Sequence, residues 1–189
     1  MTDMKRIFDI MLALVSVSML GIPMLVIAVL IKLTSKGPVI FWTDRVGANN
    51  AIFKMAKFRT MRLDAPQVAT HLMKNHDDYI TPIGKILRKY SLDEIPQLFN
   101  ILKGDMTFVG PRPALFNQSD LIELRTKKNV HKITPGVTGW AQVNGRDNLP
   151  IPIKVEFDEY YLKNRSFRLD LKIVLMTFIK AIKGEDVQH

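Results

Sequence analysis

The sequence Ser91–Gly104, SLDEIPQLFNILKG, places two adjacent acids at the start of a short amphipathic pattern. Apolar residues recur at helical spacing after the acids, and Gly104 stands where a helix C-cap is expected. Ser91 or Asp93 could be the N-cap. Pro96 favours Asp93, because proline is tolerated in the first helical turn and removes a hydrogen bond further along. The stretch therefore predicts a short helix that begins at the acid pair.

Asp93 and Glu94 would then lie at the positive end of this helix, where anions are stabilised. Both carboxyl groups should be ionised at neutral pH. Side chains in the first turn lean back toward the N-terminus, so two carboxylates could reach one metal ion. Acids are also common at helix starts for purely local reasons, and from this stretch alone that is the commoner outcome. The pair is thus a candidate for catalysis and metal binding.

Composition limits the classes of function. The 189 residues, 47% of them apolar, are enough for one domain with a core. The absence of cysteine excludes disulfides, thiolate catalysis and cysteine-ligated zinc. A net charge of +9 predicts affinity for a polyanion, such as a nucleic acid, an anionic membrane surface or a phosphorylated substrate.

An apolar segment near the N-terminus narrows this choice. Residues 7–31 carry one charged residue, Asp9, and exceed the roughly 20 residues that cross a bilayer. Pro23 predicts a kink within the segment. Basic residues flank both ends, so we expect a re-entrant helix whose ends lie on the same side of the membrane; the alternative is a plain single-pass helix. Asp9 could pair with Arg6 near the headgroups as a structural anchor.

The next elements combine short strands and helices. Residues 39–42 and 52–58 read as two strands of a β-hairpin joined by a turn at Gly47–Asn50. Lys57 and Arg59, at the end of the second strand, would face a phosphate or solvent. Thr81 and Pro82 then predict the start of a short amphipathic helix that carries Arg88 toward the acid pair.

Two loops follow the acid pair. Pro111 and Pro113 bracket Arg112 in an extended segment, which would preorganise a bidentate phosphate contact or form only a rigid turn. The glycine-rich residues 133–146, which end at Arg146, could surround a small ligand. Residues 167–182 form a broad apolar stripe with basic neighbours, typical of a helix in a membrane interface or of a core helix.

Several motifs in collinear order resemble the bacterial sugar transferase family, the monotopic polyprenyl-phosphate phosphoglycosyl transferases. Together they cover nearly the whole chain and are far more specific than any one alone. They are KRIFD at 5–9, KFRTM at 57–61, SLDEIPQ at 91–97, LKGDM at 102–106, GPRP at 110–113 and PGVTGWAQVNGR at 135–146. The chain resembles the family's minimal catalytic form. It departs from the family at Ile22, because serine often precedes the proline of the membrane segment.

The resemblance implies an α+β, predominantly helical fold in a monotopic membrane protein. Residues 1–36 would be a kinked re-entrant membrane helix with basic flanks. Residues 37–189 would be one cytoplasmic catalytic domain at the membrane surface, with a short β-hairpin and interfacial amphipathic helices. The implied location is the cytoplasmic face of the bacterial inner membrane.

The implied reaction is transfer of a phospho-sugar from a UDP-sugar to polyprenyl (undecaprenyl) phosphate with release of UMP. This would be the first membrane step in the assembly of a bacterial glycan, such as an exopolysaccharide or O-antigen. Asp93 would form a covalent aspartyl phospho-sugar, and Glu94, with Asp93 nearby, would hold Mg²⁺. The implied partners are the UDP-sugar, polyprenyl phosphate and an anionic phospholipid membrane, with no nucleic acid.

The resemblance also assigns roles to other residues. Arg88 and Arg112 would neutralise phosphate oxygens, and Pro111 would shape the loop that carries Arg112. Weaker candidates for nucleotide or lipid-phosphate contacts are Lys57, Arg59, Gln97 and Arg146. Arg6, Asp9 and Pro23 would anchor the chain in the membrane.

Two other classes of function compete with this interpretation. A membrane-tethered nucleic-acid-binding module without catalysis would explain the charge, and its affinity would fall steeply with salt. It would explain neither the acid pair nor the Pro-Arg-Pro loop. A purely structural membrane scaffold would explain only the apolar ends of the chain.

Overall fold

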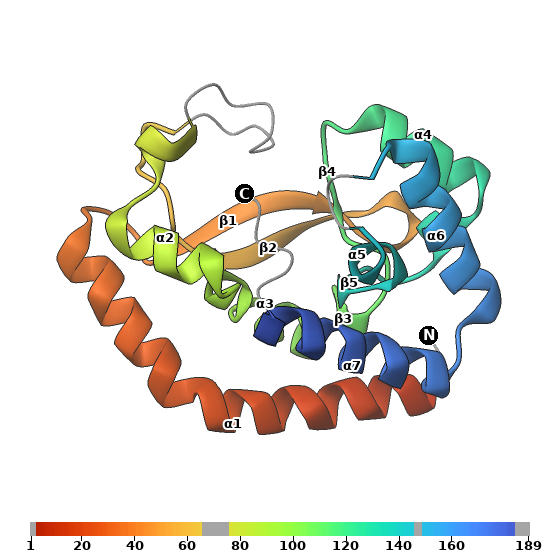
Figure 1. Cartoon of the computed structure of the whole chain (residues 1–189), viewed down its shortest axis with the longest axis horizontal. Helices are drawn as coiled ribbons and strands as arrows, with labels where there is room; N and C mark the ends of the chain where they lie inside the picture. Colours follow the sequence, from red (N-terminus) through yellow and green to blue (C-terminus); the bar gives the residue numbers. More distant parts are fainter. Residues whose placement is uncertain (1–2, 66–75, 146–148, 184–189) are drawn as a thin grey trace.

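The computed structural model describes residues 3–65, 76–145 and 149–183, and it confirms the predicted α+β, predominantly helical fold (Figure 1). The helices are α1 (Asp3–Thr34), α2 (Pro82–Lys89), α3 (Gln97–Lys103), α4 (Ser119–Lys127), α5 (Trp140–Val143), α6 (Ile151–Asn164) and α7 (Phe167–Lys183). The strands are β1 (Ile40–Val46), β2 (Ile52–Phe58), β3 (Thr107–Val109), β4 (Ala114–Leu115) and β5 (Gly136–Thr138). Short 3-10 helices are η1 (Ala48–Asn50), η3 (His76–Tyr79), η4 (Leu92–Glu94) and η5 (Val130–Lys132).

The predicted hairpin is confirmed. β1 and β2 pair antiparallel, with Ile40 opposite Phe58 and Val46 opposite Ile52. The turn contains Asn49 and Asn50 with positive φ, a conformation that asparagine tolerates better than most residues. β4 adds to the other edge of β1 and was not predicted. The three strands hold Lys57 near one end of β2.

The predicted start of α2 is also confirmed. Thr81 is the N-cap, and its hydroxyl oxygen accepts a hydrogen bond from the Gly84 amide at 3.0 Å. Pro82 is the first helical residue, where its missing N–H costs nothing. The helix buries Leu87 and Arg88 on its inner side and so directs Arg88 toward the interior of the domain.

The predicted helix start at the acid pair is wrong. Asp93 and Glu94 lie in the 3-10 turn η4, which follows Ser91 in the left-handed region at φ 54°, and α3 begins only at Gln97. Neither Ser91 nor Asp93 caps an α-helix by a side-chain hydrogen bond. Pro96 explains the delay, because it has no N–H to donate to a preceding helical turn. The predicted C-cap at Gly104 is confirmed, with φ 101°.

The apolar segment forms the single element α1, which has Pro23 inside it. Figure 1 shows α1 following one side of the molecule and changing direction partway along. Ala13, Ile27 and Ile31 face the domain and are buried with residues of β2, α2 and α3. The opposite side exposes apolar residues at helical spacing, namely Ile7, Met11, Leu14, Met19, Ile22, Leu25, Val29 and Leu33. The re-entrant topology and the boundary at residue 36 stay predictions.

A parallel pair of short strands supports the loops that follow the acid pair. β3 pairs with β5, with Thr107 opposite Gly136 and Val109 opposite Thr138. A Cβ on Gly136 would collide with the backbone of Gly110, so the two loops can approach this closely only with glycine there. The segment predicted as a glycine-rich loop thus contains β5 and α5.

Candidate active site

The acid pair lies buried at the junction of α2, α3 and β2. Asp93 is 8% exposed and the side chain of Glu94 is 17% exposed. The 3-10 turn η4 carries both acids, and both carboxylates lie near the ammonium group of Lys57.

Two cations converge on the pair from distant parts of the chain. Lys57 Nζ lies 2.7 Å from Glu94 Oε1 and 3.6 Å from Asp93 Oδ2. Arg112 Nη2 donates a hydrogen bond to the same Glu94 Oε1 at 2.9 Å. The structure therefore brings together four of the residues that the sequence proposed.

Burial and these cations shift the two acids in opposite directions. Burial raises the pKa of Asp93 above its usual range, and the negative charge of Glu94 raises it further, against the lowering effect of Lys57. Burial alone would also raise the pKa of Glu94. Arg112 and Lys57 outweigh it and hold the Glu94 pKa far below its usual value. Glu94 is therefore the fixed anion of the pair.

Two more predicted residues lie close to the acids. The positive charge of buried Arg88 acts to lower the pKa of Asp93, which places its guanidinium within electrostatic reach. Gln97 is 2% exposed, and its Nε2 has no hydrogen-bond partner in the structure. A buried amide donor without a partner is costly, so Gln97 is suited to contact a bound molecule.

Arg59 and Arg146 differ from the other predicted cations. Arg59 directly follows β2, and its side chain reaches Ser35, just beyond the end of α1. Its Nη2 donates to the backbone oxygen of Ser35 at 3.0 Å and to the Ser35 hydroxyl at 2.7 Å. A substrate contact for Arg59 stays a prediction, while its observed contact ties α1 to β2. Arg146 lies outside the described residues.

Asn100 is a site residue that the sequence did not single out. It is buried, and its side chain acts on the edge of β2: Oδ1 accepts from the Ala56 amide at 3.0 Å and Nδ2 donates to the Lys54 oxygen at 2.7 Å. These two bonds replace a neighbouring strand just before Lys57. The available signal in the sequence was a polar asparagine beside Ile101 among the apolar residues of α3.

Arg125 and Asp158 were also missed. They form a buried ion pair between α4 and α6, with Arg125 Nη2 2.7 Å from Asp158 Oδ2. Arg125 also donates to the backbone oxygen of Arg112 at 2.8 Å. No local sequence signal connects residues from these separate elements.

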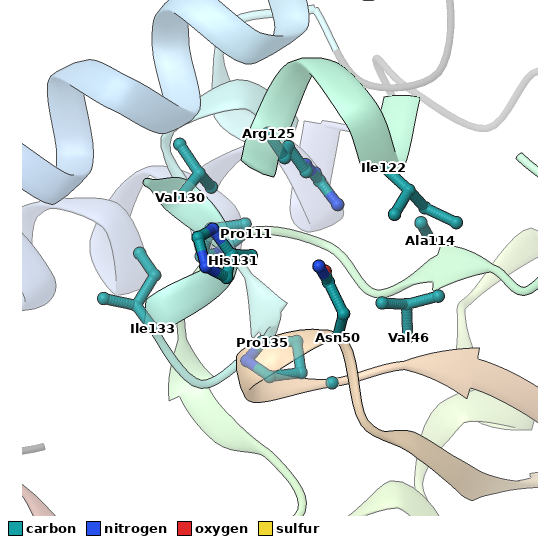
Figure 2. Close-up of a pocket in the computed structure, with 11 residues that line it drawn as sticks. Val46, Asn50, Pro111, Ala114, Ile122, Arg125, Val130, His131, Ile133 and Pro135 are labelled. Atoms are coloured by element: carbon teal, nitrogen blue, oxygen red, sulfur yellow. The ribbon is translucent and has the colours of Figure 1, made fainter. Parts of the chain in front are cut away.

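A small pocket lies where the turn of the hairpin meets α4 and η5 (Figure 2). Asn50, Pro111, Arg125 and His131 are among its lining residues. Its volume of about 20 Å³ holds little more than a water molecule, so this pocket is no site for a nucleotide. Of the predicted site residues, Pro111 lines it.

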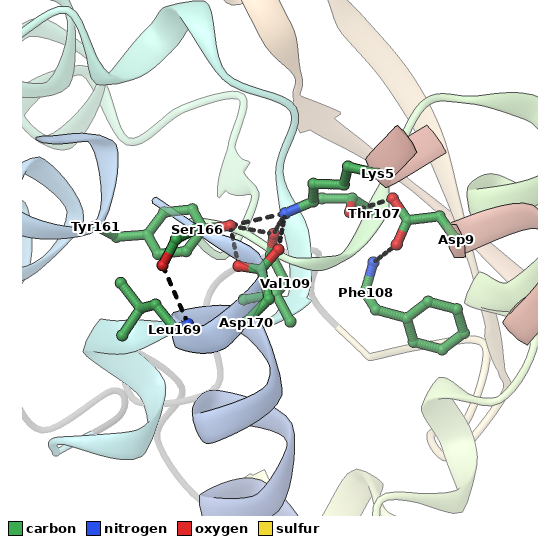
Figure 3. A network of polar contacts seen from close by, with 9 residues as sticks. All are labelled: Lys5, Asp9, Thr107, Phe108, Val109, Tyr161, Ser166, Leu169 and Asp170. Atoms are coloured by element: carbon green, nitrogen blue, oxygen red, sulfur yellow. Dashed lines mark hydrogen bonds and ion pairs between the residues drawn. The ribbon is translucent and has the colours of Figure 1, made fainter. Parts of the chain in front are cut away.

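The N-terminal anchor residues bind protein groups. Asp9 is 1% exposed and accepts from the Thr107 hydroxyl at 2.6 Å and the Phe108 amide at 3.3 Å, as Figure 3 shows. Arg6 donates to the backbone oxygens of Ile101 and Leu102 in the last turn of α3. The expected Arg6–Asp9 pair is therefore wrong, because each residue has a better partner in the domain.

Lys5 adds a third connection at the same end of α1 (Figure 3). Its Nζ donates to the Val109 oxygen at 2.8 Å, the Tyr161 hydroxyl at 2.7 Å and Asp170 at 2.8 Å. Beside it, the ring of Phe8 contacts Phe167 edge to face, with centroids 5.2 Å apart. α1, α6 and α7 are thus joined where β3 leads into the Arg112 loop.

Comparison with known proteins identifies a family and several relatives of the chain. A family model described as bacterial sugar transferase matches residues 1–184. The chain is 41% identical over 186 residues to a UDP-N-acetylgalactosamine-undecaprenyl-phosphate N-acetylgalactosaminephosphotransferase of Aeromonas hydrophila, which covers 95% of this chain and 44% of that protein.

Two further relatives match along nearly all of this chain. The first is a UDP-glucose:undecaprenyl-phosphate glucose-1-phosphate transferase of Escherichia coli (strain K12), 40% identical over 188 residues, with 94% of this chain and 40% of that protein covered. The second is the uncharacterized sugar transferase EpsL of Bacillus subtilis (strain 168), 38% identical over 188 residues, with 98% and 91% covered. The chain thus spans less than half of the two named phosphotransferases and nearly all of EpsL.

Proposed function

The chain belongs to the bacterial sugar transferase family, and on this basis we propose that it transfers a sugar 1-phosphate from a UDP-sugar to polyprenyl phosphate and releases UMP. Two relatives that are named as undecaprenyl-phosphate sugar-phosphate transferases support this acceptor and this donor. The observation that carries the proposal is the acid pair: buried Asp93 lies next to Glu94, which binds both Lys57 and Arg112.

In the first proposed step, a carboxylate oxygen of Asp93 attacks the phosphorus that carries the sugar. A bond forms between these two atoms, the bond from that phosphorus to the bridging oxygen breaks, and UMP leaves with the electron pair. An aspartyl phospho-sugar remains on the enzyme. The raised pKa of Asp93 favours this role, because a more basic carboxylate is a stronger nucleophile once it is ionised.

In the second step, a phosphate oxygen of the lipid attacks the same phosphorus. The bond to Asp93 breaks, the carboxylate is regenerated, and the product is a polyprenyl diphosphate sugar. Each step brings two anions together, so fixed cations must offset their repulsion. Lys57, Arg88 and Arg112 supply three positive charges around the acid pair.

The proposal includes Mg²⁺ at the acid pair. This ion commonly uses one or two protein carboxylates together with substrate phosphates. Asp93 and Glu94 supply two carboxylates, and the part of the chain that the structure describes holds no group of three or more His, Cys, Asp or Glu that could form a complete protein site. The donor set therefore fits an ion completed by the substrate. When bound, the ion would neutralise charge on the phosphate oxygens.

We place the enzyme on a membrane through α1 and α7. Within the described residues, α1 is the one helix long and apolar enough to cross a bilayer. Its apolar outer side adjoins α7 at Phe8 and Phe167, and α7 exposes Phe167, Leu171, Leu175 and Phe178. Such a surface would be unfavourable in water and suits the membrane interface where a lipid phosphate resides.

Contacts at both ends of α1 support re-entry from the cytoplasmic face. Asp9 is bonded to Thr107 near one end, and Ser35, just beyond the other end, is bonded to Arg59. A 32-residue helix is about 48 Å long, so a straight crossing would carry one end far from the domain. Two ends on one domain fit a helix that enters and leaves on the same side.

Release of UMP tests the proposed function. The full chain in detergent would be incubated with undecaprenyl phosphate and a panel of UDP-sugars, including glucose, galactose and N-acetylated sugars. We expect continuous UMP release with both substrates, and without the lipid at most one UMP per protein. UMP release that does not depend on undecaprenyl phosphate, or no UMP release with any sugar of the panel, would contradict the proposal.

A further inference from the structure

The loop that carries Arg112 is held through its carbonyl groups. Pro111 and Pro113 have no N–H, so the backbone around Arg112 offers mainly acceptors. The oxygen of Pro111 accepts from the Gly136 amide at 2.9 Å, and that of Pro113 accepts from Arg45 at 3.3 Å. The oxygen of Arg112 itself accepts from Arg125 at 2.8 Å.

Arg125 is held in turn by Asp158. Its Nε and Nη2 donate to Asp158 Oδ2 at 3.0 and 2.7 Å, which leaves Nη1 directed at the Arg112 oxygen. Both residues are buried, at 8% and 1% exposed. A planar guanidinium with two nitrogens fixed on one carboxylate has little freedom to move the third.

These contacts connect α6 to the acid pair. Asp158 orients Arg125, Arg125 fixes the backbone at Arg112, and the side chain of Arg112 donates to Glu94 at 2.9 Å. We propose that Arg125, oriented by Asp158, is a positioning residue that places Arg112 for phosphate transfer. This inference rests on the proposed function and extends it to two residues outside the acid pair.

A purely structural role would be to join α4 and α6. Apolar residues can often do this equally well, because burying two charges costs about as much as their attraction returns. An apolar pair cannot supply the third donor, which reaches the carbonyl of Arg112. The hydrogen bond from Arg125 to the Arg112 carbonyl therefore favours a role in positioning the loop.

The test is a double-mutant cycle with Arg125→Lys and Arg112→Ala, measured as UMP release. Lysine keeps the charge beside Asp158 but lacks the fork that bonds both partners. We expect Arg125→Lys alone to lower kcat by about 10- to 100-fold, as for other residues that orient an active group. In the Arg112→Ala background it should lower kcat by less than about 2-fold, because the positioned group is already gone.

Asp158→Asn should repeat the pattern, and Glu159→Gln is the matched control. Glu159 follows Asp158 in α6 and pairs with Lys128 and Lys163 away from the acid pair, so its variant should keep the wild-type rate. Equal loss of activity from Arg125→Lys in both backgrounds would mean a structural role and would overturn the proposal, as would no loss in either.

A separate measurement covers failure of the proposed function. If the wild type releases no UMP, hydrogen exchange of the Gly136 amide, which donates to Pro111, reports the position of the loop. Arg125→Lys should speed that exchange at least several-fold, while the exchange of α2 amides stays unchanged. Unchanged exchange at Gly136 would overturn the positioning role.

Discussion

At the scale of single residues, Asp93 and Glu94 are neighbours in the chain and similar in burial, yet their pKa values are shifted in opposite directions. The difference follows from where the cations lie. Lys57 and Arg112 contact Glu94 Oε1 at 2.7 and 2.9 Å, while Lys57 lies 3.6 Å from Asp93. The pKa of Glu94 is lowered and that of Asp93 is raised. One acid is thereby suited to hold charge and the other to form a bond.

Replacing Asp93 should separate activity from stability. Asp93→Asn keeps the size of the side chain but removes the attacking oxygen, so UMP release should fall by several orders of magnitude while the protein stays folded. With the wild type and UDP-sugar alone, a phospho-sugar adduct should map to Asp93 by mass spectrometry. An adduct on Glu94, or near-normal turnover of the variant, would favour direct attack by the lipid phosphate.

The raised pKa of Asp93 also predicts a change in the pH dependence of stability. A carboxyl group with a higher pKa in the folded state favours folding when protonated, so its contribution is lost as pH rises through that folded value. Asp93→Asn cannot ionise and avoids this loss. Its Tm should exceed that of the wild type at pH 7, and the gap should shrink toward pH 4. Asp64→Asn, at an exposed position, is the control and should show no such gap.

The same two carboxylates predict that activity depends on Mg²⁺. If the ion is held by Glu94 and the substrate phosphates, excess chelator should abolish UMP release and added Mg²⁺ should restore it. Glu94→Gln should lower activity severely and weaken the response to Mg²⁺. Full activity in excess chelator would rule out the metal assignment.

At the scale of elements, the position of Lys57 depends on an asparagine in another element. The free edge of β2 would leave backbone groups unpaired at Lys54 and Ala56. Asn100 on α3 pairs with both and so joins α3 to β2. The acid pair lies in η4, just before α3, and this connection therefore helps to hold Lys57 beside Glu94.

Asn100→Ala tests this connection. Loss of the side-chain amide leaves the buried Ala56 amide and the Lys54 oxygen without this partner, which should cost about 1–3 kcal/mol in the free energy of unfolding. Because Lys57 is no longer fixed, kcat should also fall. Urea unfolding in detergent and UMP release measure the two effects. Asn164→Ala, which removes an exposed side-chain bond at the end of α6, should change neither.

The elements that the sequence predicted are those with local signals. Thr81 and Pro82 mark the start of α2, the turn residues Gly47–Asn50 mark the hairpin, and the apolar segment marks α1. β3 and β5 could not be predicted in this way. Each has only three residues, and they pair with one another across more than twenty residues of sequence.

The site was predictable to the same extent. The charged residues around Asp93 were found because their motifs resemble a known family. Asn100, Arg125 and Asp158 were missed because their roles depend on partners in other elements. The helix start at Asp93 was misplaced because Pro96 forces a break that two overlapping capping patterns concealed.

At the scale of the whole molecule, one side carries the exposed apolar residues of α1 and α7, and the charged residues Lys5, Arg6 and Asp9 at the start of α1 point into the domain. Asp9 and Arg6 lie within the N-terminal turns of α1, yet both bind backbone or side-chain groups of the domain. This arrangement keeps charge out of the apolar surface while it fixes α1 to β3 and α3. With α1 and α7 on a membrane, as proposed, the acid pair would be held at a set distance from the bilayer.

The same arrangement predicts the topology of α1. The chain contains no cysteine, so Met4→Cys and Lys36→Cys each introduce a single label at an exposed position near one end of α1. If α1 re-enters, a membrane-impermeant maleimide applied to intact cells should label neither variant, and both should react once the inner membrane is opened. A straight crossing would place the two ends on opposite sides, because about 30 Å of hydrocarbon would separate them. Labelling of one variant but not the other in intact cells would therefore contradict re-entry. It would also require the contacts of Asp9 with Thr107 and of Ser35 with Arg59 not to exist together in the membrane.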